Sequence, residues 1–426
     1  MKTNEQLLKA VQELVSIDSV ALVDVSEKAP YGAGPAKALD YVMELCRELN
    51  ISAVNDDYKI AWAEIGQGEE IVGVLGHLDI VPAGDGWEHS PWGEVCGDRL
   101  YGRGVVDDKG PVLAALFAMK ALRDAGVPLP RRVRLILGQC EEVGDWNDMN
   151  YYKERYQLPV FGFTPDADFP AIYGEKGILN FDLTASLAEG DLLSIEGGEA
   201  ANMVPNWCRC TYRAADGSQQ TVETRGVSAH ASTPEKGENA ISAMMAKLEE
   251  LGVKSPFVEF YRKHIGFDYN GVPMGCGLED EQSGKLTLNA GVLRMNGSEA
   301  TLTLDIRNPV TFGREDVEQP ILRACEPYGI RCACTESMDS IYMDKNGKVV
   351  RAMVDVYESI TGDTSGPIVI GGGTYARAMP GIVAFGPMQP GRECTEHQAN
   401  EYILLDDLFT AKEIYRQTIE KLANLD

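Results

Sequence analysis

The first 176 residues alternate short apolar runs with helical patterns, and this alternation restricts the chain to a small group of folds. Three apolar runs have the length and composition of buried strands: residues 71–76, 133–138 and 160–164. Residues 110–126 follow a helical pattern, with Pro111 in the first turn and Gly126 at its end. Strands that alternate with helices predict an α/β fold, in which helices flank a central, mostly parallel sheet on both faces.

The pattern changes near Gly177. Residues 179–185 and 221–226 alternate apolar and polar side chains, which is typical of half-exposed strands. Two longer runs meet at Asn296-Gly297 and predict a β-hairpin across that pair. A helical pattern near 238–251 lies between residues 221–226 and the hairpin. The segment that starts near Gly177 is therefore expected to form an α+β domain.

The α/β pattern returns in the last part of the chain. Residues 349–360 and 405–424 are expected to be helices, and residues 381–386 a buried strand. The simplest architecture is therefore one discontinuous catalytic domain, interrupted by a large insertion. Its expected boundaries are 1–176 with 346–426 for the catalytic domain, and 177–345 for the inserted domain.

The overall charge and composition exclude several classes of function. The formal charge of −26 argues against nucleic-acid partners and against anionic membrane surfaces, since both require basic patches. No apolar run approaches the roughly 20 residues that span a bilayer. The N-terminal sequence is an amphipathic helical pattern without the features of a signal peptide. We therefore expect a cytoplasmic protein.

The cysteines suggest neither a disulfide framework nor a structural zinc site. There are ten, but no C-x-x-C pair occurs, and the closest spacings are Cys208/Cys210 and Cys332/Cys334. A chain of 426 residues can bury a full core and does not need disulfides for stability. We expect all ten to be reduced, mostly buried thiols.

Acidic side chains and histidines lie on five separate stretches, most of them at the ends of predicted strands. The stretches are G-H-L-D (His77, Asp79), G-R-G-V-V-D-D-K-G (Asp107), C-E-E-V-G (Glu141, Glu142), T-P-D-A-D (Asp166) and T-E-H-Q-A-N-E (His397). Open α/β sheets place their sites at the carboxyl ends of strands. Three carboxylates and two imidazoles suit Zn²⁺, Mn²⁺ or Co²⁺. One shared aspartate would give each of two ions three protein ligands, and this set predicts metal-assisted hydrolysis.

Each stretch also has an ordinary structural interpretation. Asp107 precedes a helix and could cap it, while Asp166 could be a turn residue. Glu141 and Glu142 could form an exposed acidic loop, and a lone loop histidine such as His397 is commonly solvated. The occurrence of all five stretches in one fold favours the metal site over these separate explanations.

The motifs resemble those of the co-catalytic metallopeptidases, which include glutamate carboxypeptidases, aminoacylases, desuccinylases and carnosine dipeptidases. Within that family the chain is most similar to the peptidase V-type bacterial dipeptidases, and the resemblance covers nearly its whole length. The motifs that carry it are G-H-L-D-I-V-P-A-G-D-G-W, Y-G-R-G-V-V-D-D-K-G-P, E-E-V-G, P-D-A-D-F-P, V-S-A-H-A-S-T-P-E-K-G-E-N-A, I-G-G-G-T-Y and H-Q-A-N-E.

The resemblance implies two divalent ions. Zn²⁺ is the first choice, and Mn²⁺ and Co²⁺ are the alternatives. The two expected ligand sets are His77, Asp107 and Asp166 for one ion, and Asp107, Glu142 and His397 for the other. In the family the first aspartate of D-D-K-G bridges the ions, and its bond to the next residue is cis. Asp107 rather than Asp108 is therefore the expected bridge. The resemblance also implies that Asp79 orients His77 and that Glu141 is the general base.

The inserted domain is similar to the lid of this family. By resemblance, His230 in V-S-A-H-A-S polarises the scissile carbonyl, and Asn202 in A-N-M-V-P-N assists it. Arg307 in D-I-R-N-P is expected to bind the substrate carboxylate, although alone it could equally be a strand-end ion pair. His230 alone could be a surface loop residue. Close backbone approach to the same end of the substrate is expected at Gly372, Gly373 and Thr374.

The resemblance implies a dipeptidase acting on short peptides with a free N-terminus. An N-acyl-amino-acid amidohydrolase of the same fold is the alternative, and a non-catalytic metal- or peptide-binding relative is a third. The insertion of roughly 170 residues matches the enlarged lid of peptidase V-type enzymes, which supplies the histidine from the same chain. We therefore expect a monomer, with a dimer as the alternative.

Overall fold

The structure is a computed structural model that describes residues 2–144, 146–187 and 190–425. Contacts divide the chain into two compact units. The first comprises residues 1–173, 343–368 and 374–426, and the second comprises residues 174–342 and 369–373. The short segment 369–373, which was expected within the catalytic domain, thus groups with the inserted unit.

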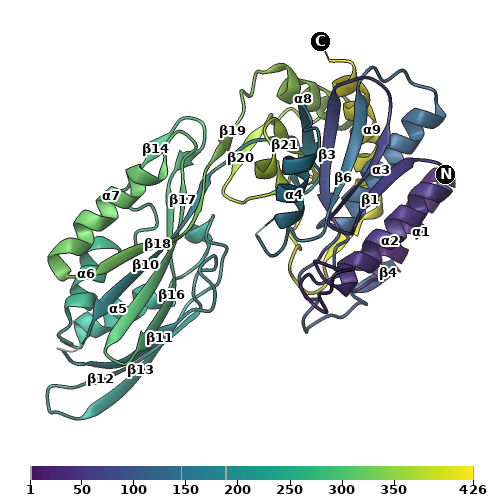
Figure 1. Cartoon of the computed structure of the whole chain (residues 1–426). Coiled ribbons are helices and arrows are strands. Elements are labelled where there is room, and N and C mark those ends of the chain that lie inside the picture. Colours follow the sequence, from purple (N-terminus) through teal and green to yellow (C-terminus); the bar gives the residue numbers. More distant parts are fainter. Residues whose placement is uncertain (1, 145, 188–189, 426) are drawn as a thin grey trace. The chain divides into compact units, whose positions relative to one another are not determined.

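The first unit is built on a mixed sheet in the order β1-β2-β6-β3-β7-β21 (Figure 1). The strands are β1 (Ser52–Asp56), β2 (Ile60–Ile65), β6 (Arg132–Gly138), β3 (Ile71–His77), β7 (Phe161–Thr164) and β21 (Ile382–Ala384). The neighbours from β6 to β21 pair in parallel, whereas β1 and β2 are antiparallel. All residues of β3 are buried, because the strand lies inside the sheet with both faces covered. The predicted α/β class is confirmed, with its parallel part restricted to the central strands.

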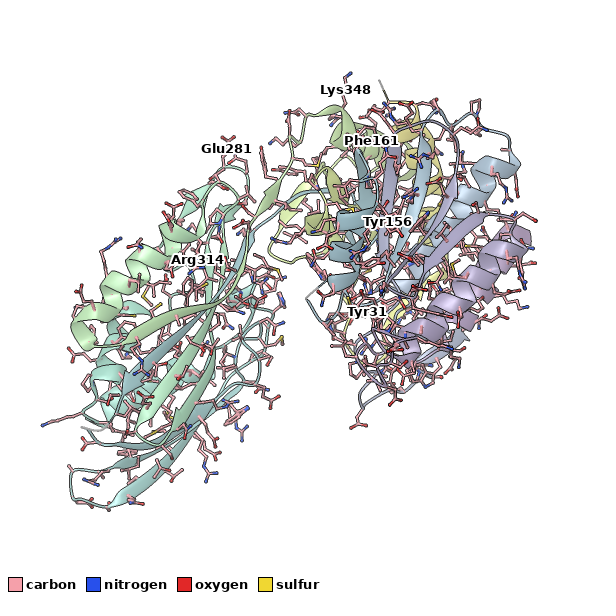
Figure 2. The ribbon with its side chains drawn as sticks, viewed as in Figure 1. Tyr31, Tyr156, Phe161, Glu281, Arg314 and Lys348 are labelled. Carbon is pink, nitrogen blue, oxygen red and sulfur yellow. The ribbon has the colours of Figure 1, made fainter. Side chains whose placement is uncertain are left out.

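An aromatic cluster anchors the antiparallel edge of this sheet. Tyr156, labelled in Figure 2, donates a hydrogen bond of 2.6 Å to Asp56 on β1. Its ring lies 4.7 Å from that of Trp62 on β2, in an edge-on arrangement. The β1–β2 hairpin is therefore held by side chains from a distant part of the chain, which the local sequence pattern did not predict.

Helices cover the sheet of the first unit. They are α1 (Lys2–Val15), α2 (Ala33–Glu48), α3 (Lys109–Asp124), α4 (Asn147–Arg155), α8 (Lys348–Thr361) and α9 (Leu405–Ala423). Helices α3 and α9 pack against each other and against β3 and β6. Nearly every residue of α3 up to Met119 is buried, which places the start of this helix, beside Asp107, deep in the core. The predicted helix over 110–126 is confirmed.

A small sheet in the order β23-β5-β4 adds a further connection in the first unit. Its strands are β4 (Trp92–Cys96), β5 (Arg99–Gly102) and β23 (Tyr402–Leu404). The pairing of Tyr402 with Tyr101 places the segment after His397 beside the segment before Asp107. Two short strands, β8 (Ala167–Asp168) and β22 (Pro387–Met388), pair in parallel. Strands β9 (Ile172–Glu175) and β20 (Ile368–Ile370) lead from the first unit into the second.

The second unit contains an antiparallel sheet in the order β13-β12-β11-β16-β17-β10-β18. The strands are β10 (Gly177–Ser186), β11 (Leu192–Gly197), β12 (Trp207–Arg213), β13 (Gln219–Arg225), β16 (Thr287–Asn296), β17 (Glu299–Asn308) and β18 (Arg331–Met338). Figure 1 shows α5 (Ala240–Glu250), α6 (Pro256–His264) and α7 (Arg314–Cys325) on one face of this sheet. The apolar positions of alternating strands such as β12 face these helices and form one core. Three short elements complete the unit: β14 (Glu279–Asp280), β15 (Gly284–Lys285) and β19 (Ile341–Tyr342).

The predicted hairpin between β16 and β17 is present, but its turn lies one residue further along the chain. Asn296 pairs with Glu299, so the two loop residues are Gly297 and Ser298 rather than Asn296 and Gly297. Gly297 has a φ of 61°, a value that a two-residue hairpin turn needs at its first position. The glycine was a correct signal for the turn, and the asparagine belongs to the strand.

Two expectations about the whole chain concern its cysteines and membranes. All ten cysteines are free, and six of them are buried. Among the described residues, no helix combines the length and the apolar character that crossing a bilayer requires.

Candidate active site

The sheet of the first unit brings the predicted acids and histidines to one edge. Strands β6, β3 and β7 are parallel neighbours, so their carboxyl ends meet at the same edge. His77 ends β3, Glu142 follows β6, and Asp166 follows β7. Asp107 precedes α3, and His397 lies in the loop before β23. Side chains from five separate segments therefore converge.

The converging side chains form two groups that share one residue. The possible ligand atoms of His77, Asp107 and Asp166 lie within 4.8 Å of one another. Those of Asp107, Glu142 and His397 also lie within 4.8 Å of one another. These groups contain the residues that the sequence analysis assigned to the two ions.

Asp107 presents one carboxylate oxygen to each group. Its Oδ1 lies 2.9 Å from Nε2 of His77, which is itself 3.8 Å from Oδ2 of Asp166. Its Oδ2 lies 2.9 Å from Nε2 of His397, which is 3.1 Å from Oε2 of Glu142. A carboxylate placed in this way can bridge two cations. The first group is buried around His77, while the second opens to solvent because the His397 side chain is 54% exposed.

Asp108 lies behind the site and is not part of either group. Its Oδ2 accepts a hydrogen bond of 3.2 Å from the backbone N–H of His77, and its side chain is fully buried. The predicted cis peptide bond between Asp107 and Asp108 is present. Of the two adjacent aspartates, only Asp107 faces the histidines.

The ring orientation of His77 is set by the backbone of Asp79. Nδ1 of His77 lies 3.0 Å from the carbonyl oxygen of Asp79 and 3.4 Å from its Oδ1. A carbonyl oxygen only accepts, so Nδ1 carries the proton and donates it. Nε2 is then the nitrogen that can bind a cation, and it is the one that faces Asp107.

The Asp79 carboxylate also accepts hydrogen bonds from the backbone of the β6 loop, which the sequence did not indicate. Its Oδ1 accepts from the backbone N–H of Glu141 at 3.2 Å, and its Oδ2 accepts from that of Glu142 at 3.0 Å. Asp79 is fully buried, so these hydrogen bonds tie the β3 loop to the β6 loop. Glu141 is half-buried beside the two groups and contributes no atom to either.

The site carries a surplus of negative charge. Burial, together with the Asp107 charge, raises the pKa of Glu142 and of Asp166 above the ordinary carboxyl range. Burial and neighbouring acids likewise raise the pKa of Glu141. Hydrogen bonds to Asp107 and Glu142 raise the pKa of His397 to about 11. Without bound cations, protons must compensate this cluster of acids.

The donor set fits two divalent cations. Three carboxylates and two imidazoles are hard-to-borderline ligands, and each group offers three of them. The raised pKa values of Glu142, Asp166 and His397 are those expected of ligands that hold protons until cations replace them.

His230 lies in an exposed loop of the second unit, where its ring is held by Ser232. The backbone N–H of Ser232 is 3.2 Å from Nδ1 of His230, and its Oγ is 2.7 Å from the same nitrogen. An N–H can only donate, so Nδ1 accepts and the neutral ring carries its proton on Nε2. The segment of Asn202 lies beside this loop, since the carbonyl of Asn202 accepts from the N–H of Ala231 at 2.8 Å.

Arg307 forms an ion pair on β17 of the second unit. Its Nε and Nη2 donate to the two carboxylate oxygens of Asp305, each at 2.7 Å. Its Nη1 donates to the carbonyl of Gly371 at 3.1 Å. Arg307 is 5% exposed, and the two hydrogen bonds to Asp305 fix the plane and direction of its guanidinium. The strand-end ion pair considered from the sequence exists, and it orients the arginine.

The three residues expected to approach a ligand differ in their surroundings. A Cβ on Gly372 would meet nothing closer than Ile370 Cδ1 at 3.4 Å, so packing does not require glycine there. A Cβ on the preceding Gly371 would lie 2.7 Å from Ser232 Cβ, so this glycine is required by the His230 loop. Gly373 is exposed. Thr374 is buried and its hydroxyl accepts from the N–H of Ala376 at 3.1 Å, where it starts the short helix η3 (Tyr375–Ala378).

Sequence reasoning missed the residues that hold the Glu141 loop from behind. Asp148 is fully buried, and its Oδ2 accepts from the backbone N–H groups of Gln139 and Cys140 at 2.6 and 3.2 Å. The same oxygen accepts from the hydroxyl of Tyr375 at 2.7 Å. The only sequence signal for Asp148 is an acid near the start of a helix, which is a common helix feature.

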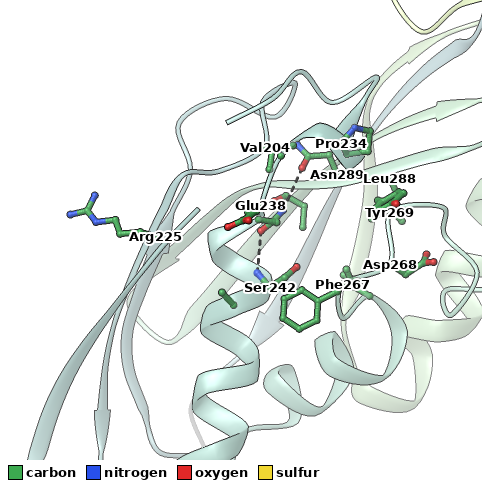
Figure 3. A pocket seen from close by; sticks show the side chains of 15 residues that line it. Val204, Arg225, Pro234, Glu238, Ser242, Phe267, Asp268, Tyr269, Leu288 and Asn289 are labelled. Carbon is green, nitrogen blue, oxygen red and sulfur yellow. Dashed lines mark hydrogen bonds between the residues drawn. The ribbon is translucent and has the colours of Figure 1, made fainter. Parts of the chain in front are cut away.

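A partly open pocket of about 280 Å³ lies within the second unit, and the predicted site residues do not line it (Figure 3). Its walls come from α5, β16 and the loop that carries Phe267 and Tyr269. Asn239 and Asn289 are joined across it by a hydrogen bond of 3.4 Å. None of the residues that line this pocket belongs to either ligand group.

Comparison with known proteins places the chain in a family. The model of "Peptidase family M20/M25/M40" matches residues 73–421. "Putative dipeptidase YtjP" of Bacillus subtilis is 34% identical over an alignment of 463 positions, which covers 99% of this chain and 98% of that protein. Human carnosine dipeptidase 1 has a TM-score of 0.64 at 16% identity, covering 99% of this chain and 97% of its own. The YXEP protein of Bacillus subtilis, described as a dinuclear metal binding peptidase, has a TM-score of 0.59 at 10% identity. The match covers 100% of this chain and 99% of that protein. The protein therefore belongs to peptidase family M20/M25/M40.

Proposed function

We propose that this protein is a metal-dependent dipeptidase that hydrolyses dipeptides with a free N-terminus. The observation that carries the proposal is the Asp107 carboxylate, which gives one oxygen to each of two histidine-containing groups, with Glu141 beside them. Relatives that cover almost the whole chain at 32–34% identity carry the name "Putative dipeptidase", which supports the same activity.

In this proposal His77, Asp107 and Asp166 hold one divalent cation, and Asp107, Glu142 and His397 hold the other. Zn²⁺ is the first choice for both positions, with Mn²⁺ and Co²⁺ as alternatives that the same donors accept. When bound, a pair of such cations lowers the pKa of water and polarises a carbonyl group.

Glu141 is the general base of the proposed reaction. Its carboxylate takes a proton from the attacking water, whose oxygen forms a bond to the peptide carbon. When the C–N bond breaks, Glu141 passes that proton to the leaving nitrogen, which departs as the free amine. The hydrogen bonds from the Glu141 and Glu142 amides to Asp79 hold this loop in place while the proton moves.

We assign His230 and Asn202 to the carbonyl oxygen of the substrate. The tautomer that Ser232 imposes leaves a proton on Nε2 of His230, and that N–H can donate to an oxygen that gains negative charge. Asn202 offers a side-chain amide on the neighbouring segment. Arg307, oriented by Asp305, is assigned to the C-terminal carboxylate, with Gly372, Gly373 and Thr374 near the same end.

The proposal is tested with a substrate panel. Metal-stripped protein is reloaded with Zn²⁺, Mn²⁺ or Co²⁺ and assayed on free dipeptides, tripeptides and N-acyl amino acids. Dipeptides are expected to be cleaved fastest, and the same dipeptides with a blocked N-terminus poorly. Hydrolysis of N-acyl amino acids without hydrolysis of dipeptides would contradict the proposal and establish a deacylase.

Exchange of Arg307 for lysine is expected to raise KM for dipeptides by about 10–100-fold, with a smaller change in kcat. Lysine keeps the charge but loses the planar donor pair that binds both Asp305 and a carboxylate. Arg314→Lys is the matched control, because this arginine (Figure 2) is exposed on α7 of the same unit and pairs with Glu318 at 2.9 Å. Equal KM values for Arg307→Lys and the parent enzyme would remove Arg307 from substrate binding.

Metal uptake is expected to release protons and to strengthen as the pH rises. Neighbouring carboxylates raise the pKa of His77 and of His397, the latter to about 11, so bound cations are expected to displace protons from the cluster. Calorimetric titration with Mn²⁺ in two buffers of different ionisation enthalpy measures the protons released. A buffer-independent heat at pH 7 would show that the histidines are not ligands.

We place the protein in the cytoplasm and expect a monomer. Ten free thiols, most of them buried, are typical of a reducing compartment. The inserted segment 174–342 has the size of the enlarged lid considered above. Light scattering on the eluted protein should give a mass near 46.5 kDa, whereas twice that mass would indicate a dimer.

A further inference from the structure

Glu401 is a buried carboxylate that is hydrogen-bonded to the segment before Asp107. It is 0% exposed and lies four residues after His397 in the same loop. Its Oε1 accepts from the backbone N–H groups of Gly104 and Val106, each at 3.0 Å. Its Oε2 accepts from Nη1 of Arg103 at 2.6 Å. Its own carbonyl oxygen accepts from the N–H of Gly102 at 3.0 Å, so one residue holds the whole segment 102–106.

Arg103 extends this arrangement to a third loop. The arginine is 2% exposed, and its Nη2 donates to the carbonyl of Ala83 at 3.4 Å. Its guanidinium carbon lies 5.5 Å from the ring centroid of Trp87. The Arg103–Glu401 pair therefore joins loops that begin after β3, after β5 and after β22.

The segment before Asp107 has little freedom to take another path. Gly104 has a φ of 89°, and a Cβ there would lie 2.9 Å from Cγ2 of Ile80. Val105 and Val106 are buried at 0% and 2% exposure. On the other side, His397 and Asn400 both have left-handed backbone conformations, with φ values of 61° and 64°. The backbones of both loops are thus restricted, and the hydrogen bonds of Glu401 join one loop to the other.

We infer that Glu401 is a positioning residue that holds the loop of the shared ligand Asp107 against the loop of His397, and so sets the affinity for the cation pair. This inference rests on the proposed metal site. Glu401 contributes no atom to either ligand group, so it acts through the backbone of residues 102–106. Residues that orient metal ligands commonly change metal affinity by about 10–100-fold when they are replaced.

A simple stabilising ion pair is the alternative explanation for Glu401. Removal of one partner from a buried ion pair leaves the other charge uncompensated, so a purely stabilising role would appear as a lower unfolding temperature of the metal-free protein with an unchanged metal affinity. A positioning role appears instead in the metal affinity, measured separately from that temperature.

The test uses Glu401→Gln in the full-length protein. The glutamine oxygen can still accept from the N–H groups of Gly104 and Val106, but its NH₂ group then faces Arg103, donor against donor. Calorimetric titration of metal-stripped protein with Mn²⁺ is expected to show about 10–100-fold weaker binding. The Mn²⁺ concentration that gives half-maximal activity should rise by the same factor. The metal-free unfolding temperature is expected to fall as well, because Arg103 keeps a buried charge without its partner, so the metal affinity is the deciding measurement.

Glu64→Gln is the matched control. Glu64 lies on β2 of the same unit and pairs with Arg134 at 2.6 Å, away from the ligand loops. This variant is expected to bind Mn²⁺ within twofold of the parent protein. A second variant, Arg103→Lys, should weaken binding in the same direction as Glu401→Gln. The double variant should lose no more than the larger single loss, because both changes break one unit.

Mn²⁺ affinity of Glu401→Gln within twofold of the parent protein would overturn the inference, and so would an equal loss in Glu64→Gln. If Glu401→Gln does not fold, the Mn²⁺ affinity of Arg103→Lys is measured instead. An affinity within twofold of the parent protein would then overturn the inference. A parent protein that binds no divalent cation would reject the metal site itself, and this result is distinct from a variant that binds as well as its parent.

Discussion

Replacement of Glu141 by glutamine is expected to lower kcat for dipeptides by about 10²–10⁴-fold while both metal ions remain bound. The amide cannot take a proton from water, but it preserves the shape of the side chain. Glu141 belongs to neither ligand group, so the donors of both ions stay in place. Steady-state kinetics and metal analysis of the same preparation measure the two quantities together.

Glu154→Gln is the control for this change. Glu154 is 70% exposed on α4, at the end of the same connection between β6 and β7, and pairs with Arg155 at the surface. Its variant should retain the parent activity. Full activity in Glu141→Gln would remove Glu141 from its role as the base, and loss of metal from that variant would make it a ligand instead.

Replacement of Asp107 by asparagine is expected to weaken both ions together, by more than about 100-fold, and to abolish activity. A residue that only supports a ligand typically costs 10–100-fold, and Asp107 is a ligand shared by both groups. The neutral amide also removes one negative charge from between the two positions. Mn²⁺ titration of the metal-stripped variant, followed by calorimetry, should show no tight site.

Asp166→Asn provides the comparison, because Asp166 belongs to the first group only. That variant should keep one of the two tight sites, with Glu142 and His397 unchanged. Independent loss of a single ion in Asp107→Asn, with the other ion bound as in the parent protein, would show that Asp107 does not bridge.

Much of the fold could be predicted from local patterns. The apolar runs of β3, β6 and β7 are short and bounded, and their continuous burial follows from their position inside a sheet. Helix α3 was marked by Pro111 in its first turn and by Gly126 after its end, where the backbone is left-handed with φ of 66°. Local periodicity records which face of an element is buried, so it predicts elements well.

The antiparallel edge and the exact turn of the second-unit hairpin were harder to predict. Strands β1 and β2 depend on Tyr156 and Trp62, which are far apart in sequence. The turn at Gly297-Ser298 depends on strand register, because Asn296 could sit in either the turn or the strand until its partner Glu299 was known.

The candidate site shows the same division between local and long-range information. The choice of Asp107 over Asp108 came from the resemblance to a family, and the structure shows the geometric difference between the two. Asp107 faces both histidines, whereas Asp108 accepts from the backbone of His77. Asp148 had no distinct sequence pattern, and Arg103 and Glu401 lie inside quoted motifs that assigned them no role. Asp148 and Glu401 accept from backbone amides of other loops, and Arg103 donates to the Glu401 carboxylate and the Ala83 carbonyl, so their roles depend on long-range contacts.

The sequence by itself determined the α/β class, the position of the insertion and the types of side chain available to bind cations. Apolar periodicity and strand-end acids are local properties, so they can be read along the chain. Only the tertiary structure decided which oxygen of Asp107 faces which histidine, that the Asp79 carbonyl sets the His77 tautomer, and that Glu401 joins the two ligand loops. Hydrogen-bond direction and distance depend on groups that are far apart in sequence, and folding alone brings them together.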